Sequence, residues 1–329
     1  MRILFLAFAL LVLGLEARII TDDYGRDVEI PESITKIYAA SPPLTMSLLA
    51  FDPSIIAAIN FPWSAKQKAY VGEAYDKPVA GGFFGQGQRP NFEILAESKP
   101  DVIIMWGRMN GAEKIVYKLA KLGIPVLMVR NDSIKDLISQ FTLYGQLTGN
   151  TKRAEELIDY TQETLSLIDS LQDKLAQKKP VRYYFSQGVD GLFSECRGSF
   201  HLEPFDYSGA KNALDCEMSS NYGMEKISME SVVMADPDVI VAMEPLFVES
   251  IKQNPHFKHL RAVRKDKVYL VPSEPFNYIT RPPSFMRLMG IRWLIHSFYP
   301  DLLEVSLEAE KQRFEKVFFK DLNQKKENR

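Results

Sequence analysis

Hydrophobic residues recur every three to four positions over one long stretch near the middle of the chain, from Asn150 to about Lys178. That spacing is the period of an α-helix, and no glycine or proline interrupts it. Gly149-Asn150 provides a capping start, and Pro180 follows the end. One helix of this length would measure roughly 40 Å, longer than ordinary globular helices. We expect a stiff spacer between two lobes rather than a coiled coil, because no second repeat of this kind exists in the chain.

Short apolar runs alternate with helical patterns on both sides of this stretch. An alternating segment at 18–31, with Asp23-Tyr24-Gly25 at its centre, predicts a hairpin. The predicted strands are 34–40, 55–60, 102–106, 124–129, 181–186, 239–242 and 268–271. The predicted helices are 44–51, 92–97, 113–122, 134–148, 203–210, 229–234, 284–298 and 302–319. This alternation is typical of α/β lobes with mainly parallel sheets.

One segment has an internal counterpart. Residues 91–104 align without gaps on 228–241, so that Glu93 matches Glu230 and both copies carry a Pro-Asp pair before an apolar run. Each copy predicts a short helix, a turn and a buried parallel strand. Because one copy lies on each side of the long helix, we expect two similar lobes joined by it. The alternative is a chance similarity between two helix–strand units.

The first residues have the pattern of an export signal. Met1-Arg2 precedes an unbroken apolar run at 3–13, and Ala17 ends an acceptable cleavage site. The run is too short to span a bilayer comfortably, so we expect a cleaved signal peptide and a periplasmic product rather than an uncleaved anchor. The predicted organisation is a signal peptide at 1–17, an N-terminal lobe at 18–148, a bridging helix at 149–179, a C-terminal lobe at 180–320 and a polar tail at 321–329.

Composition narrows the possibilities further. Hydrophobic residues make up 46% and charged residues 25% of the chain, with a net charge of -2, which favours a folded globular protein and argues against nucleic acid as a partner. The two cysteines, Cys196 and Cys216, are isolated from other metal ligands. In an exported protein such a pair usually bridges, so we expect a disulfide that fastens the loop from His201 to Tyr207.

The sequence offers no catalytic constellation. The motifs of a nucleophile elbow, a Walker loop, a zinc protease helix and a redox cysteine pair are absent. The glycine-rich segment at 85–90 lacks the third glycine of a dinucleotide loop. Of the four histidines, only His201 lies where a ligand could reach it, and it is a weak candidate metal ligand. We expect a protein that is not an enzyme and has no cofactor.

Aromatic and cationic residues gather instead at the ends of predicted strands. Loops at strand ends line the crevice of α/β lobes, where aromatics offer flat apolar contact and arginines bind anionic groups. The pattern therefore predicts a site for a bulky, anionic, partly apolar ligand, although core packing is the alternative for any single residue. The candidate ligand-binding residues are Trp63, Phe83, Phe84, Arg89, Trp106, Arg108, Phe193, Arg197, Phe276, Tyr278 and Arg281.

Several segments, in this order, carry a family resemblance: Thr21-Asp22-Asp23-Tyr24-Gly25-Arg26-Asp27-Val28, Asn91-Phe92-Glu93, Lys99-Pro100-Asp101-Val102, Gly209-Ala210-Lys211-Asn212 and Arg281-Pro282-Pro283-Ser284. The chain resembles the periplasmic substrate-binding proteins of ABC importers in the ferric-siderophore and cobalamin class, class III. The similarity covers nearly all of the mature chain. It implies two Rossmann-like α/β lobes with mainly parallel sheets, joined by one long rigid helix, with the ligand between them.

The resemblance also implies partners and roles. A monomeric protein would deliver its ligand to the transmembrane permease of an ABC importer, with Glu93 and Glu230 docking on permease arginines. From the residues alone, these two are first-turn carboxylates favoured by the helix dipole. Because a continuous helix resists bending, ligand closure should be small.

The identity of the ligand stays open at this point. The order of expectation is an iron–siderophore or other metal chelate, possible metals including nickel, then an oxyanion such as molybdate or tungstate, then cobalamin. Cys196 and Cys216 depart from the commoner family pattern. Two rival classes are a metal chelatase-like enzyme on a similar fold and a scaffold protein without a small ligand.

Overall fold

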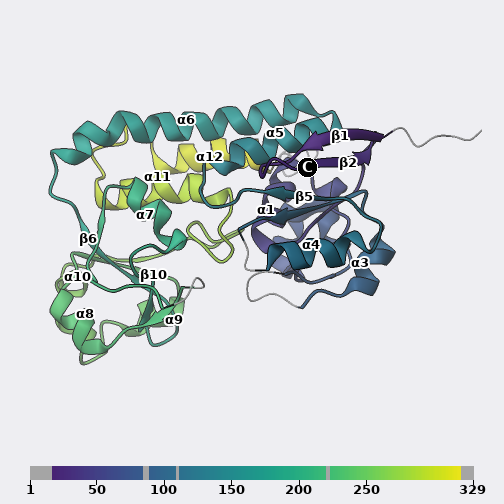
Figure 1. Cartoon of the computed structure of the whole chain (residues 1–329). Coiled ribbons are helices and arrows are strands. Elements are labelled where there is room, and N and C mark those ends of the chain that lie inside the picture. Colours follow the sequence, from purple (N-terminus) through teal and green to yellow (C-terminus); the bar gives the residue numbers. More distant parts are fainter. Residues whose placement is uncertain (1–16, 84–88, 109–110, 220–222, 320–329) are drawn as a thin grey trace, which may run out of the picture.

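The computed structural model describes residues 17–83, 89–108, 111–219 and 223–319. Two α/β lobes are joined by helix α6 (Thr151–Ala176), which runs along one side of the molecule (Figure 1). The long helix is therefore confirmed, within the stretch that the apolar period predicted. It begins where the Asn150 side chain accepts a hydrogen bond from the backbone N–H of Arg153.

The first lobe contains a parallel sheet in the order β3-β4-β5 and an antiparallel hairpin, β1-β2. Every residue of the three parallel strands is buried, which matches their unbroken apolar sequences. The strands are β1 (Ala17–Thr21), β2 (Asp27–Pro31), β3 (Ile37–Ala39), β4 (Val102–Trp106) and β5 (Val126–Val129). The helices are α1 (Pro42–Phe51), α2 (Lys68–Val71), α3 (Phe92–Ser98), α4 (Ala112–Ala120) and α5 (Asp136–Thr148).

The strand predicted at 55–60 is wrong. The segment makes only isolated bridges, from Ile56 to Ile37 and from Ile59 to Val79. A 3-10 turn, Pro53–Ile55, leads into it, with the Asp52 side chain accepting from the backbone N–H of Ser54. The segment is apolar and buried, but it forms no continuous ladder of hydrogen bonds. A turn precedes it, and its pairing partner changes from Ile37 to Val79 along its length.

The second lobe repeats the parallel sheet, in the order β11-β10-β6-β8, and adds a short antiparallel pair, β7-β9. Its strands are β6 (Arg182–Ser186), β7 (Phe193–Ser194), β8 (Lys211–Asn212), β9 (Glu225–Lys226), β10 (Val239–Ala242) and β11 (Val268–Leu270). Its helices are α7 (Glu203–Tyr207), α8 (Met229–Ala235), α9 (Pro245–Ser250) and α10 (Arg261–Arg264).

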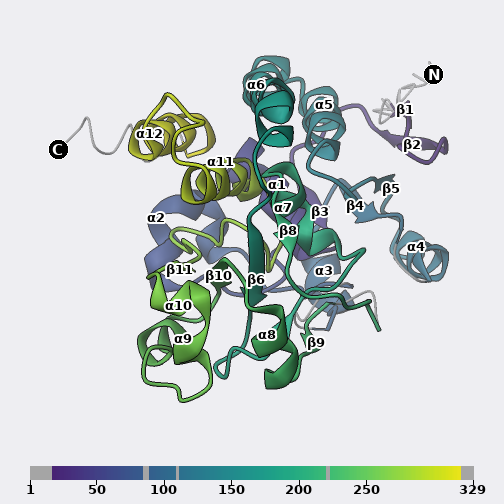
Figure 2. The same cartoon turned by 90° about the vertical axis from the view of Figure 1, so that its left-hand side faces the viewer.

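The last two helices, α11 (Met286–Phe298) and α12 (Leu307–Phe318), return toward α6 and lie beside it, as Figure 2 shows. Helix α12 begins later than the predicted residue 302, because Ser306 caps its start by accepting from the backbone N–H of Ala309. Arg153, in the first turn of α6, donates to the carbonyl oxygens of Ala50, Phe51 and Val317. The start of α6 is thereby tied to the ends of both α1 and α12.

The internal counterpart found in the sequence is a repeat in three dimensions. In the first lobe Asp101 exchanges two hydrogen bonds with the backbone of Lys36, each 2.8 Å long. In the second lobe Asp238 makes the same pair of bonds with Arg182, at 2.8 and 3.1 Å. A seven-residue helix precedes each aspartate, α3 in the first lobe and α8 in the second. Each helix is capped by a residue in the left-handed backbone conformation. The similarity of the two segments is therefore structural and not due to chance.

The lobes also touch directly. Glu203, in α7, accepts hydrogen bonds from Ser133 Oγ (2.7 Å) and from the backbone N–H of Ile134 (2.9 Å) in the first lobe. The same carboxylate pairs with Arg287 of α11 at 2.9 Å, and both side chains are largely buried. Among the described residues, no helix is long and apolar enough to cross a membrane.

Candidate functional site between the lobes

The lobes meet at the carboxyl ends of their parallel strands. Trp106 is the last residue of β4, and Gln187 directly follows β6. The Trp106 ring lies edge-on to Phe200 of the second lobe, with 5.8 Å between ring centroids, and its indole N–H donates to Asp132 Oδ1 at 3.1 Å. Ligands of α/β proteins bind outside such strand ends, so this junction is the candidate site.

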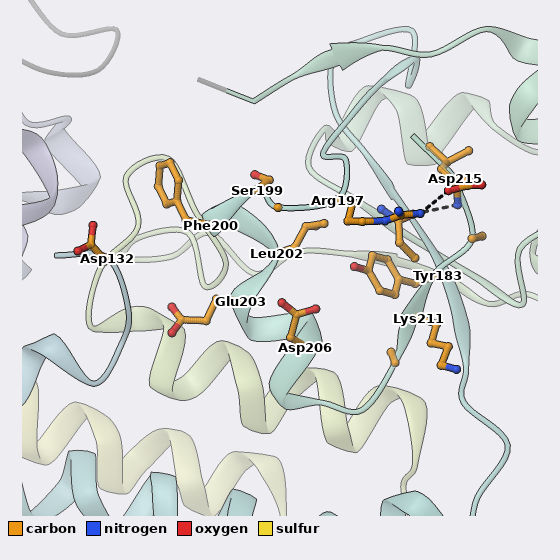
Figure 3. Close-up of a pocket in the computed structure, with 15 residues that line it drawn as sticks. Asp132, Tyr183, Arg197, Ser199, Phe200, Leu202, Glu203, Asp206, Lys211 and Asp215 are labelled. Carbon is orange, nitrogen blue, oxygen red and sulfur yellow. Dashed lines mark hydrogen bonds and ion pairs between the residues drawn. The ribbon is translucent and has the colours of Figure 1, made fainter. Parts of the chain in front are cut away.

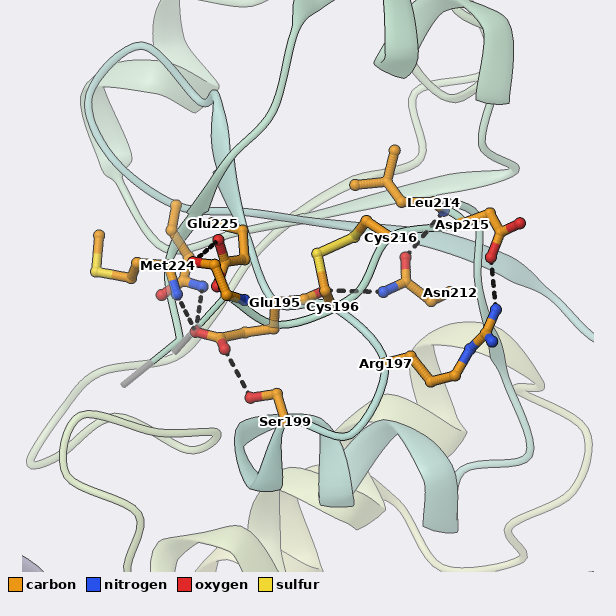
Figure 4. Close-up of a disulfide and its surroundings, with 12 residues drawn as sticks. Glu195, Cys196, Arg197, Ser199, Asn212, Leu214, Asp215, Cys216, Met224 and Glu225 are labelled. Atoms are coloured by element: carbon orange, nitrogen blue, oxygen red, sulfur yellow. Dashed lines mark hydrogen bonds and ion pairs between the residues drawn. A yellow bond between two sulfur atoms is a disulfide. The ribbon is translucent and has the colours of Figure 1, made fainter. Parts of the chain in front are cut away.

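A buried carboxylate organises the second-lobe side of the junction. Glu195 is fully buried and accepts hydrogen bonds from Ser199 Oγ (2.6 Å) and the backbone N–H of Met224 (3.2 Å) (Figure 4). It also accepts from Arg281 Nη2 (2.6 Å) and Gln187 Nε2 (2.9 Å). Burial lowers the pKa of the Arg281 guanidinium, and the charge of Glu195 opposes that shift. The carboxylate thus holds a partly buried arginine in one orientation at the junction.

A disulfide lies next to this carboxylate. It joins Cys196 to Cys216, the pair that the sequence analysis expected to bridge (Figure 4). Asn212 Nδ2 donates to the Glu195 carbonyl oxygen at 2.9 Å, and the backbone N–H of Arg197 donates to the Cys216 carbonyl oxygen at 3.0 Å. These bonds fasten the loop that carries Glu195 to β8 and to the segment that follows it.

His201 is buried beside the same loop. Its Nδ1 is hydrogen-bonded to Thr280 Oγ1, and its ring lies against Phe200 with 4.1 Å between centroids. In the part of the chain that the structure describes, no group of three or more His, Cys, Asp and Glu side chains could hold a metal ion. A metal-binding role for His201 stays a prediction, without a ligand cluster to support it.

Three predicted contact residues are packed between the lobes. Trp63 is nearly buried, donates its indole N–H to the Ala74 carbonyl oxygen at 3.0 Å, and meets the Phe276 ring edge-on at 5.8 Å. Tyr278 is equally buried, and burial raises its pKa to about 12. All three side chains are held by protein atoms, so a ligand could reach them only at their edges.

The predicted cations of the first lobe are exposed. Arg108 contacts Asp132 at 3.4 Å with 74% of its side chain exposed, and Asp132 also accepts from Trp106. Arg89 is exposed and has no hydrogen bond or ion pair among the described residues. These two arginines therefore carry charge that the fold leaves available to a ligand.

The remaining aromatic candidates are half-buried. Phe83 packs edge-on against Phe92 of α3, with 5.7 Å between ring centroids, and Phe193 lies in β7. Phe84 falls outside the described residues. Their contact with a ligand stays a prediction.

Arg197 lies away from the junction, in a groove of the second lobe. It pairs with Asp215 at 2.5 Å, and both side chains are exposed. The groove has a volume of about 600 Å³ and reaches the first lobe at Asp132 (Figure 3). Its charged lining residues are Asp132, Arg197, Glu203, Asp206, Lys211 and Asp215.

Sequence reasoning named Arg281 but missed Glu195, Gln187 and Asp132, which position the side chains of the site. Glu195 and Arg281 are 86 positions apart, and nothing in the sequence pairs them. Gln187 could have been found, because it directly follows a predicted strand, where site residues gather. Asp132 follows β5 in the same way, after two intervening residues of loop.

Comparison with known proteins agrees with this architecture. The model of the periplasmic binding protein family matches residues 48–275. The iron-uptake system-binding protein of Bacillus subtilis is 28% identical over 202 residues, 58% of this chain and 61% of that protein. The vitamin B12-binding protein of Yersinia pestis is 23% identical over 188 residues, 57% of this chain and 60% of that protein. The match thus spans about 60% of the length of these curated relatives.

Solved structures match over a larger share. An ABC transporter solute binding protein from Sulfurospirillum deleyianum superposes with a TM-score of 0.83 at 31% identity, covering 92% of this chain and 95% of that one. The molybdate-bound MolA of Haemophilus influenzae gives a TM-score of 0.71 at 20% identity, covering 92% and 98%, which shows the fold alone. By the extent of these matches, the chain belongs to the periplasmic binding protein family.

Proposed function

We propose that this protein binds a metal chelate in the crevice between its lobes and delivers it to the transmembrane permease of an ABC importer. The observations that carry the proposal are the Arg281 guanidinium, which buried Glu195 holds on the second-lobe side of the junction, and the contact of Phe200 with Trp106 between the lobes. An arginine suits the anionic donor groups of a chelate, and the aromatic rings suit its organic body. Iron–siderophore chelates come first, and nickel or other metal chelates are included.

A chelate fits better than a bare metal ion. A bare ion needs several protein ligands in one place, whereas a chelate brings its own donor atoms. No such ligand group occurs among the described residues. The family to which the chain belongs consists of binding proteins, which also argues against a metal chelatase-like enzyme. The cleft side chains argue against a scaffold protein without a small ligand.

An oxyanion is the second candidate. The structural neighbour MolA is bound to molybdate, and exposed Arg89 and Arg108 could serve molybdate or tungstate as well as a chelate. Cobalamin is the third candidate, on the similarity to vitamin B12-binding proteins.

Delivery would use the two matched glutamates. Glu93 and Glu230 are exposed in the first turns of α3 and α8, which lie on the part of the molecule away from α6 (Figure 1). A backbone N–H and Ser228 lower the pKa of Glu230, so it is charged at neutral pH. Two separated carboxylates suit two cationic sites on a permease, and such rim charges mainly raise the rate of encounter.

The proposed location of the protein follows from the export-signal pattern of its first residues. Residues 1–17 would act as a cleaved signal peptide, and the mature monomer would work in the periplasm. The N-terminal residue of the protein purified from that compartment, determined by mass spectrometry, tests the cleavage.

Native mass spectrometry of the protein from its own periplasm tests the ligand class, because the bound mass identifies metal and chelator. Titration with ferric siderophores, nickel chelates, molybdate and cobalamin, followed by the fluorescence of Trp63 and Trp106, then ranks the candidates. Arg281→Ala should weaken binding of the best ligand roughly 10-fold by removing a charge-assisted contact. If none of these ligands binds at micromolar concentration, the proposal is wrong.

A further inference from the structure

Helix α8 presents an apolar pair beside its exposed glutamate. Glu230, Val233 and Met234 are three and four positions apart, so they share one face of the helix. Met234 is 84% exposed and Val233 is 45% exposed, whereas Val232 on the opposite face is fully buried. The two exposed apolar side chains are neighbours and are bordered by a charged residue, the arrangement in which exposed apolar surface can serve as a contact site.

The matching helix of the first lobe lacks this pair. The gapless alignment places Ala96 and Glu97 of α3 at the positions of Val233 and Met234. The inward residues are equivalent, since Leu95 is as buried as Val232. The difference is therefore confined to the outward face, and packing within the lobe does not account for it.

We propose that Val233 and Met234 make an apolar contact with the permease next to Glu230. The permease surface that receives the second lobe would then combine a cation with an apolar pocket. The surface that receives the first lobe would meet Glu93 and Glu97 and would be cationic alone. This inference rests on the proposed function, because it needs the permease as partner.

Four features favour the permease over a second copy of this chain. The apolar pair is continuous with Glu230, and α8 and α3 both lie away from α6 (Figure 1). A symmetric dimer through α8 would place each patch against itself, bringing two Glu230 carboxylates together. The patch is also too small for a stable dimer, which needs on the order of 800 Å² from each partner.

The test is binding of the ligand-loaded protein to the permease in nanodiscs, at low and high salt. Met234→Gln keeps side-chain length and helix propensity while removing the apolar end. It should weaken binding roughly 10-fold at both salt concentrations, because burial of apolar surface is not screened. Glu230→Gln should weaken binding chiefly at low salt. The matched control is Val305→Ala, which removes a half-exposed valine near α6 and should leave binding unchanged.

The possible outcomes distinguish a failure of the apolar contact from a failure of the proposed delivery to a permease. If the wild-type protein binds and Glu230→Gln weakens it, but Met234→Gln binds normally, the apolar contact is wrong and delivery stands. A dimer seen by light scattering that Met234→Gln abolishes would assign the patch to a second copy and overturn the inference. If the wild-type protein does not bind the permease at all, the proposed delivery function fails.

Discussion

The two lobes share a scaffold and differ in how they present the site. Each has a parallel sheet with the same helix–turn–strand unit at its centre, fixed by Asp101 in one and Asp238 in the other. In the first lobe, the site cations are exposed and weakly paired, as Arg108 is with Asp132. In the second lobe, Arg281 is held by a fully buried carboxylate beside a disulfide. The two lobes therefore share a scaffold but differ in their loops at the site. The second-lobe loops hold an arginine in one orientation, whereas the first-lobe loops leave their arginines exposed.

The largest effect, on uptake, should come from the exposed glutamate that occupies the same position in both lobes. Replacing both Glu93 and Glu230 with alanine should abolish uptake in cells, because each lobe loses its proposed contact with the permease. Ligand affinity should be unchanged, since both side chains are exposed and neither is among the proposed ligand contacts. Uptake assays and ligand titration check this, and uptake that persists in the double variant contradicts the docking role.

Glu195→Ala and Asp132→Ala compare the two sides of the site directly. Removing Glu195 leaves Arg281 partly buried without its partner, which should cost about 3–5 kcal/mol of unfolding free energy. Removing Asp132 breaks an exposed pair with Arg108 and should cost about 1 kcal/mol or less from that ion pair. Urea unfolding measures both, and equal losses would show that the two sides are not organised differently.

The disulfide should stabilise the second-lobe loop by a smaller amount. Replacing Cys196 and Cys216 with serine should lower stability by about 2–4 kcal/mol, because the loop gains conformational freedom on unfolding. The reductant TCEP should destabilise the wild-type protein and leave the double variant unchanged. Thermal unfolding with and without reductant makes the measurement, and a wild-type protein indifferent to complete reduction contradicts the prediction.

The smallest effect concerns the tyrosine packed at the junction. Burial raises the pKa of Tyr278 to about 12, above the value near 10 of an unfolded tyrosine. The unfolded chain therefore loses this proton first, and the associated stability is present below pH 10 and is lost between about pH 10 and 12. Tyr278→Phe should flatten the loss of stability over that interval. An unchanged alkaline profile would indicate that Tyr278 titrates normally.

Local patterns predicted the scaffold well. The apolar period located α6, and the alternation around Asp23-Tyr24-Gly25 located the β1-β2 hairpin. Both signals depend on residues close in sequence. The segment at 55–60 failed because strand formation needs a continuous partner, and that partner changes along the segment.

The site was harder to predict because its key contacts are distant in sequence. The pairing of Arg281 with Glu195 depends on the fold that brings the two loops together. Trp63 and Trp106 look alike in the sequence, since both follow apolar segments. In the structure both rings are buried, Trp63 against Phe61 and Phe276, and Trp106 against Phe200 of the other lobe. Residue type alone could not show which partners enclose each ring.

The bonds of Arg153 bear on how this protein can be dissected. Through that side chain, the carbonyl ends of α1 and α12 are joined, although α1 precedes the bridging helix and α12 is the last helix that the structure describes. Tyr160 of α6 likewise packs on Phe314 and Phe318 of α12. A fragment that ends after α6 would expose the Tyr160 ring, which Phe314 and Phe318 of α12 cover. It would also lose the hydrogen bond from Arg153 to the Val317 carbonyl oxygen. The two lobes are therefore poor candidates for separate expression.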